Sequence, residues 1–122
     1  MKVKIDTKEK FHVITPEEPI LSANMTEELK QKLLPFLTTQ IKNVVLKLGE
    51  VVEVDNNSAE AILNLQQQFY DTNASFVICE MQKSVEDFFD KLEMLEVLNV
   101  APTESEAWDI VQMEEIEREF LD

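Results

Sequence analysis

The chain has 122 residues, of which 44% are hydrophobic and 30% are charged, and this length supports one domain with its own hydrophobic core. Its 11 Lys and Arg residues and 25 Asp and Glu residues leave a formal net charge of −14, which repels phosphate backbones and anionic membrane surfaces. Nucleic acids are therefore unfavourable partners. A basic protein surface is a favourable one, although an acidic surface also serves solubility alone.

Targeting and disulfide signals are not found in the sequence. The N-terminal segment MKVKIDTKEKFHV contains no apolar stretch of signal-peptide length, and no segment approaches the roughly 18 apolar residues of a membrane-spanning helix. The single cysteine, Cys79, cannot form an internal disulfide. We therefore expect a soluble, cytoplasmic protein that does not insert into membranes.

The first third of the chain predicts a hairpin followed by a helix. Residues 3–5 and 11–14 show the alternation of β-strands and are separated by a polar stretch. Asn24 then precedes MTEELKQKLLPFL with Glu27 three positions on, which is the arrangement of a reciprocal helix cap. Pro35 is expected to kink or end this helix.

Strands and helices alternate in the rest of the chain. The aliphatic run VVLKL (44–48) and the later run SFVICEM (75–81) are typical of buried strands, and the apolar spacing of AILNLQQQFY between them predicts a helix. Ser84 with Asp87 predicts the cap of a further helix. After a short strand in VLNVAP, Thr103 with Glu106 predicts the cap of a last helix that continues to about residue 120.

The resulting order of elements is β, β, α, β, α, β, α, β, α. Strands that alternate with helices need crossover connections, so we predict an α/β fold with a mostly parallel central sheet of four or five strands and about four helices packed on it. In such sheets, polar sites form where the carboxyl ends of strands meet helix N-termini. The segment VDNNSAE (54–60), which we call the joint, lies at such a place.

The residues of the joint predict a structural role. Asn57 is a favourable N-cap residue, and Glu60 lies three positions on to complete a capping box. Ser58 would then be the first helical residue, with its hydroxyl facing solvent. Phosphorylation of Ser58 is the alternative, because a helix N-terminus tolerates a phosphate.

No residue pattern indicates catalysis. His12 is the one histidine, and no nucleophile motif or glycine-rich phosphate loop accompanies it, so we interpret it as a surface or packing residue. Cys79 lies in a predicted central strand and is interpreted as an inert buried thiol. The carboxylates show no calcium-loop or histidine-carboxylate pattern. We therefore expect no enzymatic activity, no metal and no cofactor.

The chain resembles the STAS domain family, the sulfate transporter and anti-sigma-factor antagonist fold, from about residue 11 to 107. The resemblance rests on NVVLKLGEVVEVD with its terminal Asp55, on SFVICEMQKSVEDFFDKLEML and on the closing VAPTESEAW. SANMTEELKQKL also matches the place where the family usually has a Gly and an Asp before its first helix. The resemblance implies a single STAS-like domain over residues 1–122.

At the joint, the chain departs from the family pattern. Members that antagonise anti-sigma factors carry Asp-Ser-Ser-Gly or Asp-Ser-Thr-Gly, and a partner serine kinase phosphorylates the second hydroxyl residue. Aligned on Asp55, that position holds Asn57, whose amide cannot accept a phosphoryl group, and the glycine position holds Ser58. Ser58 could replace the acceptor only if the loop were shifted by one residue. Lys47 also stands where many relatives have Asp, which is expected to change the charge around the joint.

By resemblance, we expect a non-catalytic interaction module similar to anti-sigma-factor antagonists, acting in signal transduction and transcription regulation. The implied partner is a serine kinase-type anti-sigma factor. The residues expected to bind it are Asp55, Asn56, Asn57, Ser58 and Glu60. With Asn57 at the acceptor position, the domain would stay in its binding state. Two alternatives remain open: a STAS-like subunit that binds the ATPase of an ABC lipid transport system, and a scaffold domain that has lost the phosphorylation switch.

The last helix carries apolar residues around more of its circumference than one stripe needs. We expect its apolar face to pack on the sheet. The alternative is that Phe120 and Leu121 contribute to a partner or homodimer contact. Four acidic residues would form the rim of that contact: Glu114, Glu115, Glu117 and Glu119.

Overall fold

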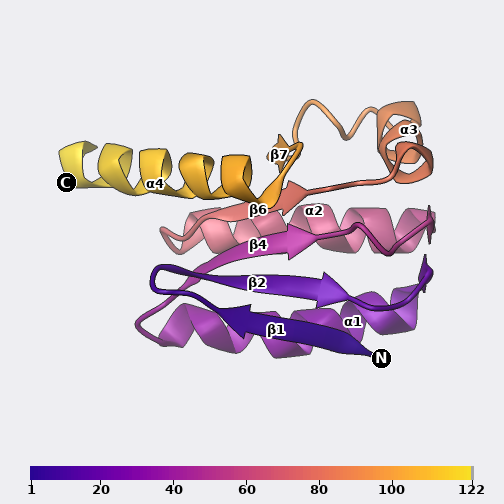
Figure 1. Ribbon diagram of the computed structural model, residues 1–122, viewed down its shortest axis with the longest axis horizontal. Coiled ribbons are helices and arrows are strands. Elements are labelled where there is room, and N and C mark those ends of the chain that lie inside the picture. Colours follow the sequence, from indigo (N-terminus) through magenta and orange to yellow (C-terminus); the bar gives the residue numbers. More distant parts are fainter. Residues whose placement is uncertain (122) are drawn as a thin grey trace.

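The central sheet consists of the strands β1 (Val3–Thr7), β2 (Phe11–Pro16), β4 (Asn43–Lys47), β6 (Phe76–Cys79) and β7 (Val100–Ala101). The computed structural model, which describes residues 1–121, orders them β1-β2-β4-β6-β7 (Figure 1). β1 and β2 form the predicted antiparallel hairpin. β2, β4, β6 and β7 are parallel neighbours, as crossover connections require.

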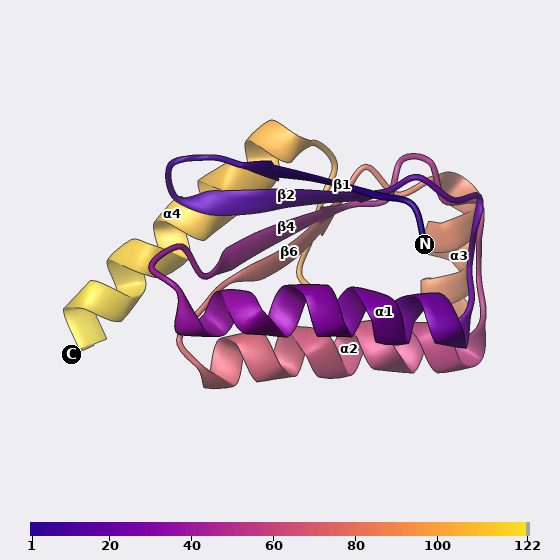
Figure 2. The same cartoon turned by 90° about the horizontal axis from the view of Figure 1, so that it is seen from below.

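The α-helices are α1 (Ala23–Leu33), α2 (Asn56–Asp71), α3 (Lys83–Lys91) and α4 (Glu104–Leu121). Figure 2 shows α1 and α2 side by side on one face of the sheet and α4 on the opposite face. α3 joins the core of α1 and α2 through Val85 and Phe89, which are both fully buried. The predicted α/β fold is confirmed.

Alternating side chains of β4 divide the apolar interior into two cores. Val44 and Leu46 belong to the larger core beneath α1, α2 and α3, whereas Val45 belongs to a smaller core beneath α4. Side chains of neighbouring strand residues point to opposite faces, so an unbroken aliphatic run supplies both cores at once. In the smaller core, Phe11 stacks on Trp108 of α4 with their ring centroids 4.7 Å apart.

Proline ends α1 as expected. The α-helical hydrogen bonding stops at Leu33, and Pro35 occupies the first turn of a 3-10 helix, η1 (Leu34–Thr38), where its missing N–H is not needed.

A second sheet was not predicted. It pairs β3 (Ile20–Leu21) with β5 (Glu53–Val54) in parallel, and two-residue strands are too short to show a period in sequence.

Of the three caps predicted outside the joint, one is confirmed. The N–H of Glu106 donates to the hydroxyl of Thr103 over 3.1 Å, as predicted for α4. α1 is capped by Ser22, whose hydroxyl accepts from the N–H of Met25, so the prediction of Asn24 is wrong. The prediction of Ser84 for α3 is also wrong, because the N-cap there is Gln82 without a side-chain cap bond. Both helices therefore begin before the residue that was predicted to cap them, α1 at Ala23 and α3 at Lys83.

His12 and Cys79 are both structural, as interpreted from sequence. The Nε2–H of His12 donates to the carbonyl of Ile41 over 2.9 Å, and its Nδ1 forms a 2.9 Å hydrogen bond with the Thr7 hydroxyl. The same ring stacks on Phe36, with centroids 3.7 Å apart. The thiol of Cys79 is fully buried, and burial raises its pKa to about 12, which leaves it protonated and inert at neutral pH.

Truncation of Phe69 tests the larger core. Phe69 of α2 is fully buried against Phe76, with ring centroids 5.4 Å apart. Phe69→Ala should lower the free energy of unfolding by about 3–5 kcal/mol, measured by urea denaturation, because a cavity replaces the ring. The matched control is Phe120→Ala, since Phe120 is 84% exposed and its loss should stay within about 0.5 kcal/mol. Equal losses at the two positions would contradict the assigned core.

Candidate functional site

Three helices begin at the same end of the sheet. The parallel strands β2, β4 and β6 point toward this end, and α1, α2 and α3 start there (Figures 1 and 2). The joint connects β5 to α2 at this place. Because the first N–H groups of a helix have no intrahelical partner, this end collects unpaired donors and partial positive charge.

Asp55 is the N-cap of α2. Its backbone is extended and its carboxylate accepts a 2.7 Å hydrogen bond from the N–H of Ser58. Hydrogen bonds from Ser58, together with the backbone N–H of Ala23, hold the pKa of Asp55 below its ordinary value. The prediction that Asn57 caps this helix is therefore wrong. Asn and Asp cap almost equally well, so sequence alone does not decide between Asp55 and Asn57.

Ser58 is fully buried, which corrects the expectation that its hydroxyl faces solvent. Its Oγ donates a 3.1 Å hydrogen bond to the carbonyl oxygen of Leu21 in β3. This bond links the first turn of α2 to the segment that leads into α1. A phosphoryl group could reach Ser58 only if this first turn opened.

The remaining predicted residues form an exposed surface. Asp55, Asn56, Asn57 and Glu60 are all exposed. Beside them lie two exposed apolar residues that the sequence analysis did not single out: Ile20, 47% exposed, and Val52, 44% exposed. The N–H of Val52 donates to the carbonyl of Pro19, which brings these two segments together.

The start of α3 is tied to the same region. The hydroxyl of Ser84 donates to the carbonyl of Val52 over 2.8 Å, and the amide of Gln82 donates to the carbonyl of Gly49 over 2.8 Å. These bonds connect α3 to the loop between β4 and β5. Loops held by side chains from another element are pre-organised, which lowers the entropic cost of binding a partner.

Lys47 does not belong to this surface. As the last residue of β4 it shares the α4 face with Val45, and its Nζ lies 3.2 Å from Glu104 and 3.7 Å from Glu80. The hydrogen bond with Glu104 raises the pKa of Lys47. The expectation that Lys47 changes the charge around the joint is wrong, because its ammonium is paired with the first turn of α4.

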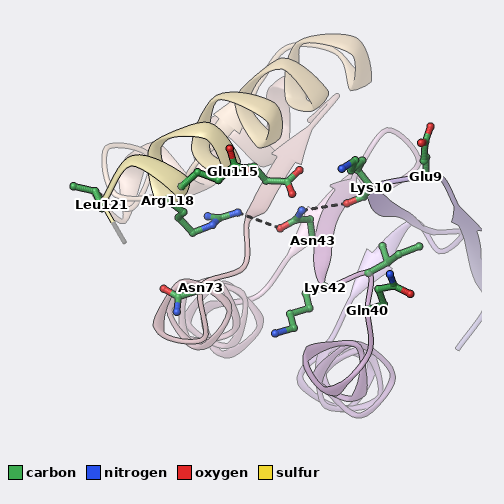
Figure 3. Close-up of a pocket in the computed structure, with 11 residues that line it drawn as sticks. Glu9, Lys10, Gln40, Lys42, Asn43, Asn73, Glu115, Arg118 and Leu121 are labelled. Carbon is green, nitrogen blue, oxygen red and sulfur yellow. Dashed lines mark hydrogen bonds between the residues drawn. The ribbon is translucent and has the colours of Figure 1, made fainter.

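A hollow lies away from this surface. A groove of about 750 Å³ opens at the opposite end of the sheet, near the C-terminal end of α4 (Figure 3). Its charged lining residues balance in sign: Glu9, Lys10, Lys42, Glu115, Arg118 and Glu119. Among residues 1–121, no group of three His, Cys, Asp or Glu side chains could hold a metal ion, and no helix is long and apolar enough to span a membrane.

Comparison with known proteins identifies the family. The STAS domain family model matches residues 2–107, so the chain belongs to the STAS domain family. This match includes the whole joint and the strands on both sides of it. No curated protein is similar enough in sequence to count as a match.

Solved structures show the same fold. A putative anti-sigma factor antagonist from Thermotoga maritima superposes with a TM-score of 0.79 at 18% identity, covering 90% of this chain and 94% of its own. The anti-sigma factor antagonist SpoIIAA, in its unphosphorylated form, gives a TM-score of 0.73 at 14% identity and covers 91% and 96%. The murine anion transporter Solute Carrier 26 family member A9 gives 0.68 at 15% identity, covering 84% of this chain but 18% of the transporter.

Removal of the Asp55 cap should give a pH-dependent loss of stability. Because the pKa of Asp55 is lowered in the folded state, its contribution is fully present above the unfolded pKa of about 4 and is lost as pH falls through the folded value. Asp55→Ala should cost about 1 kcal/mol at neutral pH, and the difference from the parent protein should shrink in acid. Urea unfolding measured across this pH range tests it. Asn57→Ala is the control and should give no pH-dependent difference.

A negative charge should destabilise the protein at Ser58 but not at the neighbouring Asn57. Ser58→Asp places a carboxylate where the side chain is fully buried, and should lower the free energy of unfolding by about 3 kcal/mol or more. Asn57→Asp places the same charge on an exposed side chain in the first turn of α2, where the helix dipole favours it by about 0.3–1 kcal/mol. Thermal or urea unfolding of both variants checks this, and a tolerated aspartate at Ser58 would contradict its burial.

Proposed function

We propose that this STAS domain is a non-catalytic antagonist that binds a serine kinase-type anti-sigma factor and thereby sequesters that regulator. The observation that carries the proposal is the exposed joint at the start of α2, in a domain whose fold matches anti-sigma factor antagonists. The binding surface comprises Asp55, Asn56, Asn57 and Glu60, with Ile20 and Val52 beside them. Ser58 supports this surface from within through its bond to Leu21.

The chemistry of this surface suits a protein partner. Exposed carboxylates and amides of the joint are accompanied by two exposed apolar side chains on the segments beside it, Ile20 and Val52. A partner that covered these two side chains would bury an apolar centre and leave polar groups at the rim. The net charge of −14 steers the domain toward a basic surface and speeds their encounter. In this proposal the domain acts by binding, with no substrate turnover, and meets its partner in the cytoplasm, where sigma-factor regulators act.

The phosphorylation switch of the family is absent in this proposal. The exposed first turn of α2 presents an amide at Asn57, and the neighbouring hydroxyl of Ser58 is buried and hydrogen-bonded. In the family's switch, an added phosphate would bring up to −2 charge beside Asp55 and Glu60, and the phosphorylated domain would release its partner. Without an accessible acceptor, the domain stays competent to bind.

The alternative is a subunit of a transport system that contacts its ATPase. The structural similarity to a domain within the anion transporter from mouse favours it, because the same fold there belongs to a transport protein. Both functions use the domain as a protein-binding module. The identity of the partner therefore separates them.

Affinity purification of the tagged protein from its own cells, followed by mass spectrometry, tests the partner. We expect an ATP-binding serine kinase-type regulator, and binding to this purified regulator should weaken about tenfold or more in Ile20→Ser/Val52→Ser. Ile5→Ser is the control, because Ile5 is 43% exposed on β1, the edge strand of the central sheet, whereas the joint follows β5 of the other sheet. Recovery of a transporter ATPase would favour the alternative, and turnover of a small molecule by the domain would contradict both.

A single substitution should restore the missing acceptor. In Asn57→Ser, a hydroxyl occupies the exposed position at which the family is phosphorylated. Incubation with the captured kinase and ATP should therefore leave the joint of the parent protein unmodified and phosphorylate the variant, as measured by mass spectrometry of the 55–70 peptide. Phosphorylation of Ser58 in the parent protein would show that the switch has moved by one residue and would refute the permanently competent state.

A further inference from the structure

The exposed side of α4 carries an apolar stripe that the fold does not use. It consists of Met113, Ile116 and Phe120, which are 60%, 53% and 84% exposed. Their spacing of three and four residues places them on one side of the helix, over about two turns. The stripe lies beyond residue 107, where the match to the family ends, so the shared fold does not account for it.

Contacts on the opposite side fix the rotation of α4. Ala107 and Val111 are fully buried against the sheet. One turn later, the hydroxyl of Tyr70 donates to the carboxylate of Glu114 over 2.6 Å. Arg118 then donates to the hydroxyl of Ser75 over 3.1 Å, and Figure 3 shows its side chain directed toward the sheet.

These anchors recur at helical spacing from the first turn of α4 to the last. The stripe is therefore held away from the sheet along its whole length. Figure 2 shows the last turns of α4 projecting beyond the strands. A shallow hollow of about 250 Å³ adjoins the stripe on the side facing the hairpin, and it is lined by one basic residue, Lys10, and two acidic residues, Glu115 and Glu119, together with Trp108, Gln112 and Ile116. The stripe and this hollow form one accessible surface.

Charge identifies the chemistry of the occupant. Asp109, Glu117 and Glu119 are exposed along α4, and none of them forms an ion pair with another residue in the described part of the chain. Arg118 is the one basic residue of the helix, and it is engaged by Ser75. A second copy of the chain would bring the same acids against these, and an anionic lipid surface would also be repelled. A basic, apolar segment of another protein complements this surface.

We propose that the α4 stripe is a second docking surface, which binds an amphipathic helix of a partner protein whose apolar side chains are flanked by Lys or Arg. The partner's apolar face covers Met113, Ile116 and Phe120, and its basic residues pair with Glu117 and Glu119. This surface lies at the opposite end of the sheet from the joint (Figure 1). The domain can therefore hold two proteins at once, and this second contact does not depend on the proposed function.

A peptide selection tests the chemistry directly. A random library of peptides of about 18 residues, or five helical turns, is displayed on phage, depleted on Ile116→Ser/Phe120→Ser and then selected on the full parent chain. We expect enrichment of sequences with apolar residues at helical spacing and Lys or Arg beside them. Enrichment of acidic or uncharged peptides, or no enrichment after depletion, would overturn the proposal.

Binding of the best selected peptide is then measured by fluorescence anisotropy. Ile116→Ser/Phe120→Ser should weaken it about tenfold or more, and Glu117→Lys/Glu119→Lys should weaken it to a similar degree and reduce its salt dependence. Both pairs are exposed, so folding should be preserved, and circular dichroism checks this. Ile5→Ser is the control, because Ile5 shares the face of β1 with Val3, which packs on the larger core away from α4.

Two further outcomes complete the test. Sedimentation that shows a dimer of the parent protein, abolished by Ile116→Ser/Phe120→Ser, would identify a second copy as the occupant and overturn the assignment to a basic partner. Unchanged peptide affinity in both double variants would show that the peptide binds elsewhere and would also overturn it. Ile20→Ser/Val52→Ser alters only the apolar residues beside the joint, so a failure of the proposed function and a failure of this proposal give different results.

Discussion

Burial of β4 and β6 on both faces is the constraint from which the rest of the architecture follows. Val44, Val45 and Leu46 are fully buried, although their side chains alternate between the two faces of the sheet. Helices must therefore cover both faces. Parallel pairing then requires that each connection return across the sheet, which sends α1, α2 and α3 back from the same end. The position of the joint at that end is a consequence of this topology, and it places helix N-termini beside an exposed loop.

The joint depends on this packing for its shape. The carboxylate of Asp55 accepts from the N–H of Ser58, and the hydroxyl of Ser58 donates to the carbonyl of Leu21, so the N–H and the hydroxyl of the buried Ser58 both have partners. Val54, the residue before Asp55, is 4% exposed and packs in the larger core. These buried contacts hold the turn that carries the exposed side chains of Asn56 and Asn57. Pre-organisation of this kind would lower the entropic cost of binding at the proposed surface.

The long, strongly periodic segments could be predicted from sequence, and the local details could not. The strands around Val45 and Val77 and the helix around Phe69 follow from aliphatic runs and helical spacing, which tertiary packing reinforces. The caps at Asn24 and Asn57 failed because a good capping residue lies two positions earlier in each case, Ser22 and Asp55, and the helix begins after that residue.

Other failures came from contacts between distant residues. The burial of Ser58 depends on Leu21, and the pairing of Lys47 depends on Glu104, both separated by more than thirty positions. Local periodicity contains no information on such partners. Ile20 and Val52 were missed for the same reason, since only the pairing of β3 with β5 brings their segments together beside the joint.

Acidic residues have different roles on the two sides of α4: those facing the sheet hold the helix in place, and those facing solvent are available for recognition. Glu104 and Glu114 are used inside the fold, by Lys47 and by Tyr70, and these contacts orient α4. Glu117 and Glu119 on the same helix have no such role in the described residues and remain in solvent beside Phe120. A fold that needed only solubility would be served as well by a polar residue at position 120. The combination of unused charge with an exposed ring, on a helix whose rotation is fixed, is what distinguishes a recognition surface from a merely acidic one.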